Sequence, residues 1–306
     1  LYSNAPSFRA LRAVRYLSIA LENGFTTIRD VCTEGAGFAD IDLKRGVDSG
    51  YFQGPSILAS GKGIAATGWY LPFPASQNWE IFLPSGTQHV TGRDECIKAV
   101  REQVSHGVDW IKLFADWLTP TLNADELKSV VDEARKYGVN VAAHAQTKEG
   151  IKMAIEAGVR SIEHGDGFND SLITLALAHH VFWCPTITVE EYYRSPMDSV
   201  YKYLNKAYHR KLKIVLGTDI GSFPWTINEA RELEFYVKKA GITPMDAIKT
   251  ATLNPAELLG KDDQIGQIKK NFIANIIAVK GNPLDDISLL QQVGFVMKEG
   301  KIIKQP

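Results

Sequence analysis

The stretch DWIKLFADWLTPTLNADELKSVVDEARKYGVNVAAHAQTKEGIKMAIEAGVRSIEHGD, residues 109–166, decides the fold. It holds three short apolar runs, at residues 110–116, 139–145 and 161–165. The segments between these runs have helical patterns. Apolar runs that alternate with helical segments are typical of βαβ units and a parallel sheet. We therefore expect three parallel strands here, with a helix after each of the first two.

The same alternation continues through the chain up to residue 224. The expected strands lie at residues 25–31, 56–60, 110–116, 139–145, 161–165, 182–187 and 214–219. This number of βα steps predicts an α/β fold, a (β/α)8 TIM-like barrel that lacks its first strand. A doubly wound open sheet is the alternative. The lack of a GxGxxG motif after any strand disfavours it.

Local signals mark several boundaries within this pattern. Asn123 and Glu126 have the spacing of a capping box, and Thr243 followed by Pro244 is typical of a helix start. Residues 62–93 are rich in Gly, Pro and aromatic residues without a period, so we expect a long lid or binding loop. From residue 263 short apolar runs follow one another. We expect the barrel over residues 1–262 and a few C-terminal β-strands of a small separate domain over 263–306.

Composition excludes several classes of function. The 306 residues carry 34 basic and 35 acidic side chains, so no basic surface for a nucleic-acid partner is expected. No apolar run approaches the ~18 residues of a membrane span, so no membrane partner is expected either. The three cysteines, Cys32, Cys96 and Cys184, are far apart, which disfavours a disulfide framework and indicates a reducing compartment such as the cytoplasm.

The first residue, Leu1, precedes a segment that already has a helical pattern. We expect that a preceding segment is missing from the chain, and any N-terminal targeting signal with it. A small-molecule substrate is the expected partner. If N-terminal strands are missing, the sheet edges that they would cover are exposed. We therefore also expect association into a homo-oligomer.

Four polar residues interrupt the apolar runs: Lys112, His144, His164 and Asp219. In a barrel, side chains at the C-terminal strand ends build the active site. Two imidazoles and a carboxylate are ligands that suit zinc and related ions. A buried lysine favours its neutral amine, which can react with carbon dioxide to give a carbamate able to bridge two metal ions.

Each residue also has a simpler interpretation. His144 or His164 could be a hydrogen-bonded core residue, and Asp219 could cap the following helix. Lys112 could extend its ammonium to the barrel rim. The recurrence of a polar residue at what we take to be corresponding places in four strands favours a shared metal site.

The chain resembles the metal-dependent amidohydrolase superfamily, in particular its imidazolonepropionase-like and prolidase-like branch. The matching stretches are, in the family's order, residues 24–30, 107–113, 141–145, 161–165, 217–219, 251–260 and 281–284. The resemblance implies a distorted barrel with a small β-sandwich built from both chain ends. It also implies that one or two divalent ions, with zinc expected, are bound by carboxylated Lys112 as a bridging ligand and by His144, His164 and Asp219.

The implied activity is hydrolysis of an amide or peptide-like C–N bond, in a dipeptide, a cyclic amide or an N-acyl compound. A metal-bound hydroxide would attack the carbonyl, with Asp219 as general base and then as proton donor to the leaving nitrogen. The sequence departs from the family in one respect, because its seven histidines include no His-x-His pair. We therefore interpret the chain as an N-terminally incomplete member. A non-catalytic barrel, or a lactone or phosphoester hydrolase using the same site, remain alternatives.

Overall fold

The computed structural model describes residues 4–68, 85–117 and 119–305. The chain forms two compact units, one of Leu1–Arg15 with Thr27–Arg160 and the other of Tyr16–Thr26 with Ser161–Pro306. Helix α1 (Pro6–Glu22) has residues in both units. It ends two residues before Gly24, which has a φ of +98°.

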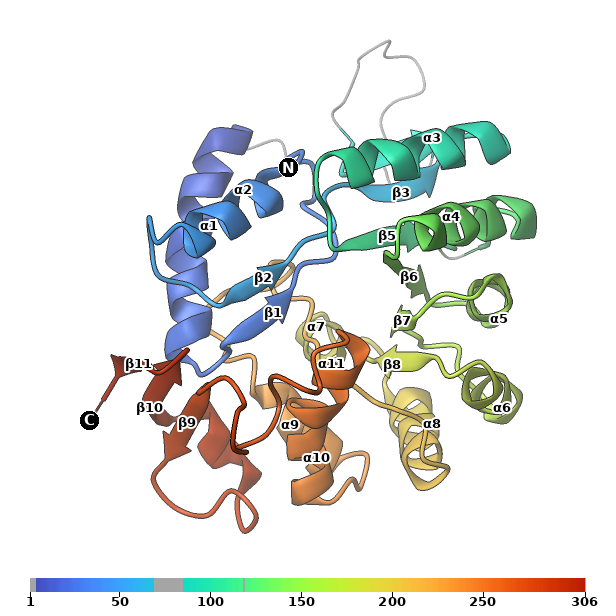
Figure 1. Cartoon of the computed structure of the whole chain (residues 1–306). Helices are drawn as coiled ribbons and strands as arrows, with labels where there is room; N and C mark the ends of the chain where they lie inside the picture. The colour runs from blue at the N-terminus through green and yellow to red at the C-terminus, as the bar shows by residue number, and fades with distance from the viewer. Residues whose placement is uncertain (1–3, 69–84, 118, 306) are drawn as a thin grey trace. The chain divides into compact units, whose positions relative to one another are not determined.

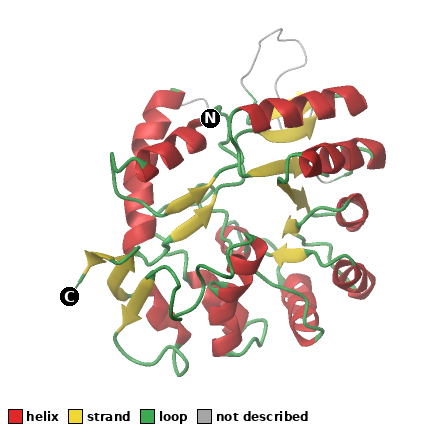
Figure 2. Ribbon diagram, viewed as in Figure 1, coloured by secondary structure: helices red, strands yellow, loops and turns green. Residues whose placement is uncertain are grey.

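The first unit alternates strands with helices, as Figure 2 shows. Its elements after α1 are β1 (Thr27–Arg29), α2 (Ala39–Asp48), β2 (Ser56–Leu58), β3 (Gly63–Ala66), β4 (Thr87–Val90), α3 (Gly92–Ser105), β5 (Trp110–Phe114), α4 (Ala124–Lys136), β6 (Asn140–Ala145) and α5 (Lys148–Ala157). Strand β1 pairs with β2, β3 pairs with β4 and β5, and β5 pairs with β6, all in parallel. Helices α3 and α4 pack against each other beside these strands (Figure 1).

The predicted helix signals of this unit are confirmed. Asn123 accepts a hydrogen bond from the amide of Glu126, and the Glu126 side chain accepts one from the Asn123 amide, which completes the capping box of α4. Helix α5 begins after Thr147, whose hydroxyl accepts from the Gly150 amide, and ends at Gly158 in the left-handed conformation. These caps fix where β6 ends and α5 begins.

The second unit is richer in helices. Its elements are β7 (Ser161–His164), α6 (Asp170–Ala178), β8 (Phe182–Cys184), α7 (Ile187–Tyr192), α8 (Asp198–His209), α9 (Arg231–Lys238), α10 (Pro244–Thr250), α11 (Leu253–Leu258), β9 (Ile276–Val279), the 3-10 helix η1 (Ile287–Gln291), β10 (Val293–Lys298) and β11 (Lys301–Lys304). Strands β7 and β8 are parallel. Thr243 caps α10 with Pro244 in its first turn, as predicted.

The predicted C-terminal strands form a small antiparallel sheet in the order β11-β10-β9. Leu21 of α1 packs with Val293 and Val296 of β10 in a buried apolar cluster. Gly24 lies so close to this sheet that a Cβ there would be 3.1 Å from Ile277. The end of α1 and the C-terminal sheet therefore share one core.

One loop prediction and one strand prediction were wrong. Residues 62–93 are not wholly irregular, because β3 and β4 lie within them; the aromatic part at 69–84 lies outside the described residues. The run 214–219 is not a strand beyond a single parallel bridge between Ile214 and Trp183. Val215 still donates its amide to the carbonyl of Trp183, but Leu216 donates its amide to the carbonyl of Thr250 instead of to a neighbouring strand.

The α/β fold with a small C-terminal antiparallel sheet confirms the predicted fold class, and its parallel βα order is consistent with a TIM barrel. The predicted domain boundary at residue 262 stays a prediction. Within the described part of the chain, no helix combines the length and the apolar character needed to cross a membrane.

A buried carboxylate holds the start of α7. Glu232 of α9 has no exposed surface, and its oxygens accept the amides of Ile187 and Thr188, each at 2.8 Å, and the Thr188 hydroxyl at 2.6 Å. Burial raises the pKa of Glu232 to about 7, against the lowering effect of these hydrogen bonds. The same interaction fixes the turn before α7, which carries Thr186.

This raised pKa predicts a pH-dependent stability. Between the ordinary pKa near 4.5 and about 7, the folded chain keeps a proton on Glu232 that the unfolded chain has released. The free energy of unfolding should therefore fall by about 3 kcal/mol as the pH rises through this window. Urea unfolding at pH 5 and pH 8 should show that the Glu232→Gln variant lacks this fall.

A matched control is Glu234→Gln on the same helix, where Glu234 pairs with Lys238 at 2.6 Å. This variant should keep the pH dependence of the wild type between pH 5 and pH 8. Identical pH dependence of the wild type and Glu232→Gln would contradict the assignment.

Candidate active site

Lys112 is the central residue of β5 and is 3% exposed. Its Nζ lies 5.4 Å from the centre of the Phe114 ring, in the geometry of a cation–π contact. Lysine is rarely buried to this degree without a specific partner or role. Its place in the middle of a fully buried strand is the least expected feature of the first unit.

His144 lies on the neighbouring strand β6 and is 5% exposed. In the β5–β6 register Lys112 is opposite Ala142, and Phe114 is opposite His144. Because side chains alternate between the faces of a strand, Lys112, Phe114 and His144 project from the same face of the sheet. The imidazole lies between the rings of Phe114 and Trp117, whose centres are 5.0 and 5.1 Å away.

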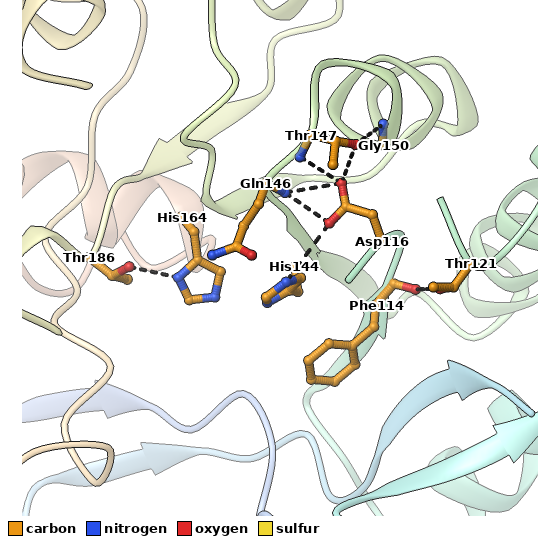
Figure 3. Close-up of polar contacts among 9 residues, drawn as sticks. All are labelled: Phe114, Asp116, Thr121, His144, Gln146, Thr147, Gly150, His164 and Thr186. Carbon is orange, nitrogen blue, oxygen red and sulfur yellow. Dashed lines mark hydrogen bonds and ion pairs between the residues drawn. The ribbon is translucent and has the colours of Figure 1, made fainter. Parts of the chain in front are cut away.

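A third polar residue, which the sequence reasoning did not select, lies next to His144. Asp116 follows β5 directly and has no exposed surface. It accepts hydrogen bonds from the amides of Gln146 and Thr147 and from the Thr147 hydroxyl, and its Oδ1 lies 3.8 Å from Nε2 of His144 (Figure 3). An aspartate directly after a strand that already carries a buried lysine was the available signal.

His164 ends β7 in the second unit and is 8% exposed. Its φ of +67° is unusual for any residue with a Cβ. Nδ1 of its ring lies 2.7 Å from the hydroxyl of Thr186 (Figure 3). The carbonyl of His164 accepts the indole N–H of Trp183 at 2.7 Å. These two buried contacts fix both the ring and the backbone of His164.

Gly165 makes this turn sterically possible. It has a φ of +75°, and a Cβ at this position would lie 2.5 Å from Nε1 of Trp183 and 2.7 Å from the Phe168 ring. Only glycine fits so close an approach. The sequence Ile-Glu-His-Gly thus ends β7 in a strained turn that packs directly on β8.

Asp219 lies in the second unit, in the segment after the Ile214 bridge, and its side chain is exposed. Its φ is +56°, so it also has a left-handed backbone. The hydroxyl of Ser222 contacts Oδ2 at 3.3 Å, and the carbonyl of Ser222 accepts a hydrogen bond from the Tyr193 hydroxyl at 2.6 Å. Asp219 does not cap a helix, because the next helix is α9, which begins at Arg231.

The predicted site residues thus fall into two pairs. Lys112 and His144 project from one face of adjacent strands in the first unit, whereas His164 and Asp219 occupy left-handed turns in the second. Lys112 lies two register positions before the level of His144, so the two do not occupy corresponding places. Among the residues that the structure describes, no group of three or more His, Cys, Asp or Glu side chains is placed to hold a metal ion.

Comparison with known proteins places the chain in a family. The model of the amidohydrolase family matches residues 3–303. Ochratoxinase from Aspergillus niger is 28% identical over 98% of this chain and 70% of its own length. Imidazolonepropionase from Pyrobaculum arsenaticum is 24% identical over 61% of this chain and 47% of its own length.

Solved structures agree with this result. A Xaa-Pro dipeptidase with methionine bound in its active site has a TM-score of 0.90 and 32% identity, covering 99% of this chain and 80% of its own. A putative prolidase from Bifidobacterium longum has a TM-score of 0.82 and 28% identity, covering 98% and 78%. These similar proteins are amidohydrolases that act on C–N bonds, and the superfamily is generally metal-dependent. On the match across residues 3–303, the chain belongs to the amidohydrolase family.

Proposed function

We propose that the chain is a metal-dependent hydrolase that cleaves an amide or peptide-like C–N bond in a dipeptide, a cyclic amide or an N-acyl compound. The observation that carries this proposal is the buried Lys112, at the centre of β5 and on the same face as His144. A lysine in the middle of a buried strand adds nothing to an apolar core and costs free energy of desolvation. A role in binding a metal explains why it is there.

By their chemistry, the four proposed ligands would suit a divalent ion. Lys112, as its carbamate, would supply carboxylate-like oxygens, His144 and His164 would supply imidazole nitrogens, and Asp219 would supply a carboxylate. This mixture of nitrogen and oxygen ligands suits zinc first, with one or two ions. The bond between His164 and Thr186 is of the kind that orients metal-ligating histidines. When bound, the metal polarises a carbonyl and lowers the pKa of water.

Asp219 would act as the general base. Its exposed carboxylate can accept a proton from the attacking water and return that proton to the leaving nitrogen, so that no proton is gained or lost overall. The left-handed backbone of Asp219 and its contact with Ser222 hold the carboxylate in one direction. Strain of this kind clusters at functional sites.

An apolar or aromatic group is the expected neighbour of the scissile bond. Trp117 stacks on the His144 ring with an interplanar angle of 21° and remains 38% exposed. Its exposed face can contact a flat or apolar substituent of the substrate. The similarity to a Xaa-Pro dipeptidase and to ochratoxinase supports small amide substrates.

Hydrolysis and its base can be tested together. The zinc-loaded chain should hydrolyse members of a panel of Xaa-Pro dipeptides, N-acyl amino acids and cyclic amides in preference to lactones and phosphoesters. Asp219→Asn should lower kcat by about 10²–10⁴-fold, the usual contribution of a general base, with an unchanged melting temperature because the side chain is exposed.

The exposed Asp263 offers a matched control, since Asp263→Asn makes the same chemical change in the same unit. It should leave turnover unchanged. Full turnover by Asp219→Asn would refute its role as base. Preference for lactones or phosphoesters would instead indicate a lactone or phosphoester hydrolase. A lack of turnover of every compound in the panel by the zinc-loaded wild type would favour a non-catalytic barrel.

The carbamate gives a second prediction. Lys112→Ala should lose zinc, measured per chain by elemental analysis, and formate or acetate should partly restore it by replacing the lost oxygens. Wild-type chain equilibrated with ¹³C-bicarbonate should show a carbamate carbon signal that the variant lacks.

The control is Lys62→Ala, which removes a lysine of the same unit that pairs with Glu102 at 3.3 Å. It should keep both the zinc and the carbamate signal. If Lys112→Ala bound as much zinc as the wild type, carboxylation of Lys112 would not be needed for metal binding.

A further inference from the structure

We propose that Asp116 is a positioning residue that sets the tautomer and orientation of the His144 imidazole, so that Nδ1 is the nitrogen presented to the metal. This inference rests on the proposed function in one point only, that His144 is a metal ligand. Asp116 itself contacts neither metal nor substrate in this proposal, because it acts through His144.

Three donor groups of Gln146 and Thr147 fix the position of the Asp116 carboxylate. Oδ2 accepts the amide of Thr147 at 2.8 Å, its hydroxyl at 2.7 Å and the amide of Gln146 at 3.1 Å. Oδ1 accepts the Gln146 amide at 2.9 Å. These donors lie in the turn that joins β6 to α5, so the carboxylate is tied to the strand that carries His144.

The chain also leaves room for this carboxylate. A Cβ on Gly150 would lie 2.0 Å from Oδ2 of Asp116, closer than any side chain could approach. Glycine in the first turn of α5 therefore lets the helix start directly over the carboxylate (Figure 3). A helix cap alone does not require burial this complete, because capping side chains normally remain at the surface.

The two carboxylate oxygens have different surroundings. Oδ2 receives most of the hydrogen bonds from the turn, whereas Oδ1 is the oxygen that faces Nε2 of His144 at 3.8 Å. This distance is longer than a hydrogen bond, so the interaction is an electrostatic contact. A carboxylate at this place favours the tautomer with the proton on Nε2, which leaves the lone pair on Nδ1 for a metal.

Ring and backbone contacts also restrict the His144 side chain. Phe114 and Trp117 contact the imidazole through their rings. The carbonyl of His144 accepts the amide of Ala115 at 2.9 Å. These contacts limit rotation of the ring, and in this proposal the charge on Asp116, 3.8 Å from Nε2, favours the proton on that nitrogen.

The test substitution removes the negative charge of Asp116 and keeps most of its hydrogen bonds to the turn before α5. In Asp116→Asn the amide oxygen is expected at the Oδ2 position, where it still accepts from Thr147 and Gln146. The amide N–H group then lies opposite Nε2 of His144, and only the Gln146 bond to Oδ1 is lost. The proton should then move to Nδ1. Nitrogen NMR of ¹⁵N-histidine-labelled, metal-free chain at pH 8 reads the tautomer directly, with the His144 signals assigned by their loss in His144→Gln.

The wild type should be predominantly protonated on Nε2, and Asp116→Asn should be predominantly protonated on Nδ1. The affinity for zinc, measured by competition with a chelator, should fall about 10–100-fold in Asp116→Asn, as for other residues that orient a ligating histidine. The matched control is Thr147→Val, which removes one hydrogen bond to Asp116 and the cap of α5 but keeps the charge. It should lower the melting temperature and leave the tautomer unchanged.

Two outcomes would overturn the proposal. One is a wild-type His144 protonated on Nδ1, a result that needs no variant to fold. The other is an Asp116→Asn chain that keeps both the wild-type tautomer and the wild-type zinc affinity, which would make Asp116 a helix cap alone. Absence of zinc binding by the wild type would instead refute the proposed function, because the tautomer is read without metal.

Discussion

Burial of a carboxylate under the first turn of a helix is the interaction on which the local geometry of both units depends. Asp116 lies under the start of α5 and Glu232 under the start of α7, and neither has exposed surface. Each accepts two backbone amides and one threonine hydroxyl, from Thr147 or Thr188. A buried charge without such partners would cost several kcal/mol, so these turns must form for the carboxylates to be buried. The turns that adjoin the candidate ligands are therefore among the most constrained parts of each unit.

That constraint explains how strained backbone persists in the second unit. His164, Thr186 and Asp219 all have positive φ values, at a cost of about 1–3 kcal/mol each for a residue with a side chain. Thr186 directly precedes the amides that Glu232 binds, and its hydroxyl contacts the ring of His164. The carboxylate thus stabilises a turn whose strain serves to place a histidine. Strain that is maintained in this way argues for a site rather than for an irregular strand end.

The sequence alone predicted structural features that depend on residues close together in the chain. It missed features that depend on contacts between residues far apart in the chain. The capping box at Asn123 and the helix start at Thr243 are local, and both are confirmed. The segment 214–219 has the composition of a strand, but Leu216 donates its amide to Thr250, a contact that no local pattern reveals. Strands β3 and β4 lie within residues 62–93, where Gly, Pro and aromatic residues without a period predicted a loop. Asp116 was missed because its donors lie 30 and 31 residues away.

Under the proposed function, Lys112 and His144 would share a metal site although they start at different positions along their strands. Lys112 begins two register positions before His144, which is ~6.6 Å along the strand at ~3.3 Å per residue. A lysine side chain is long enough to span most of that offset, whereas an imidazole is short. The Phe114 ring lies 5.4 Å from the lysine Nζ and 5.0 Å from the His144 ring, so both polar ends contact one aromatic ring despite different starting levels. Side chains that bind one ion must place their ligand atoms at the same point. A long side chain therefore has to start at an earlier position along its strand than a short one.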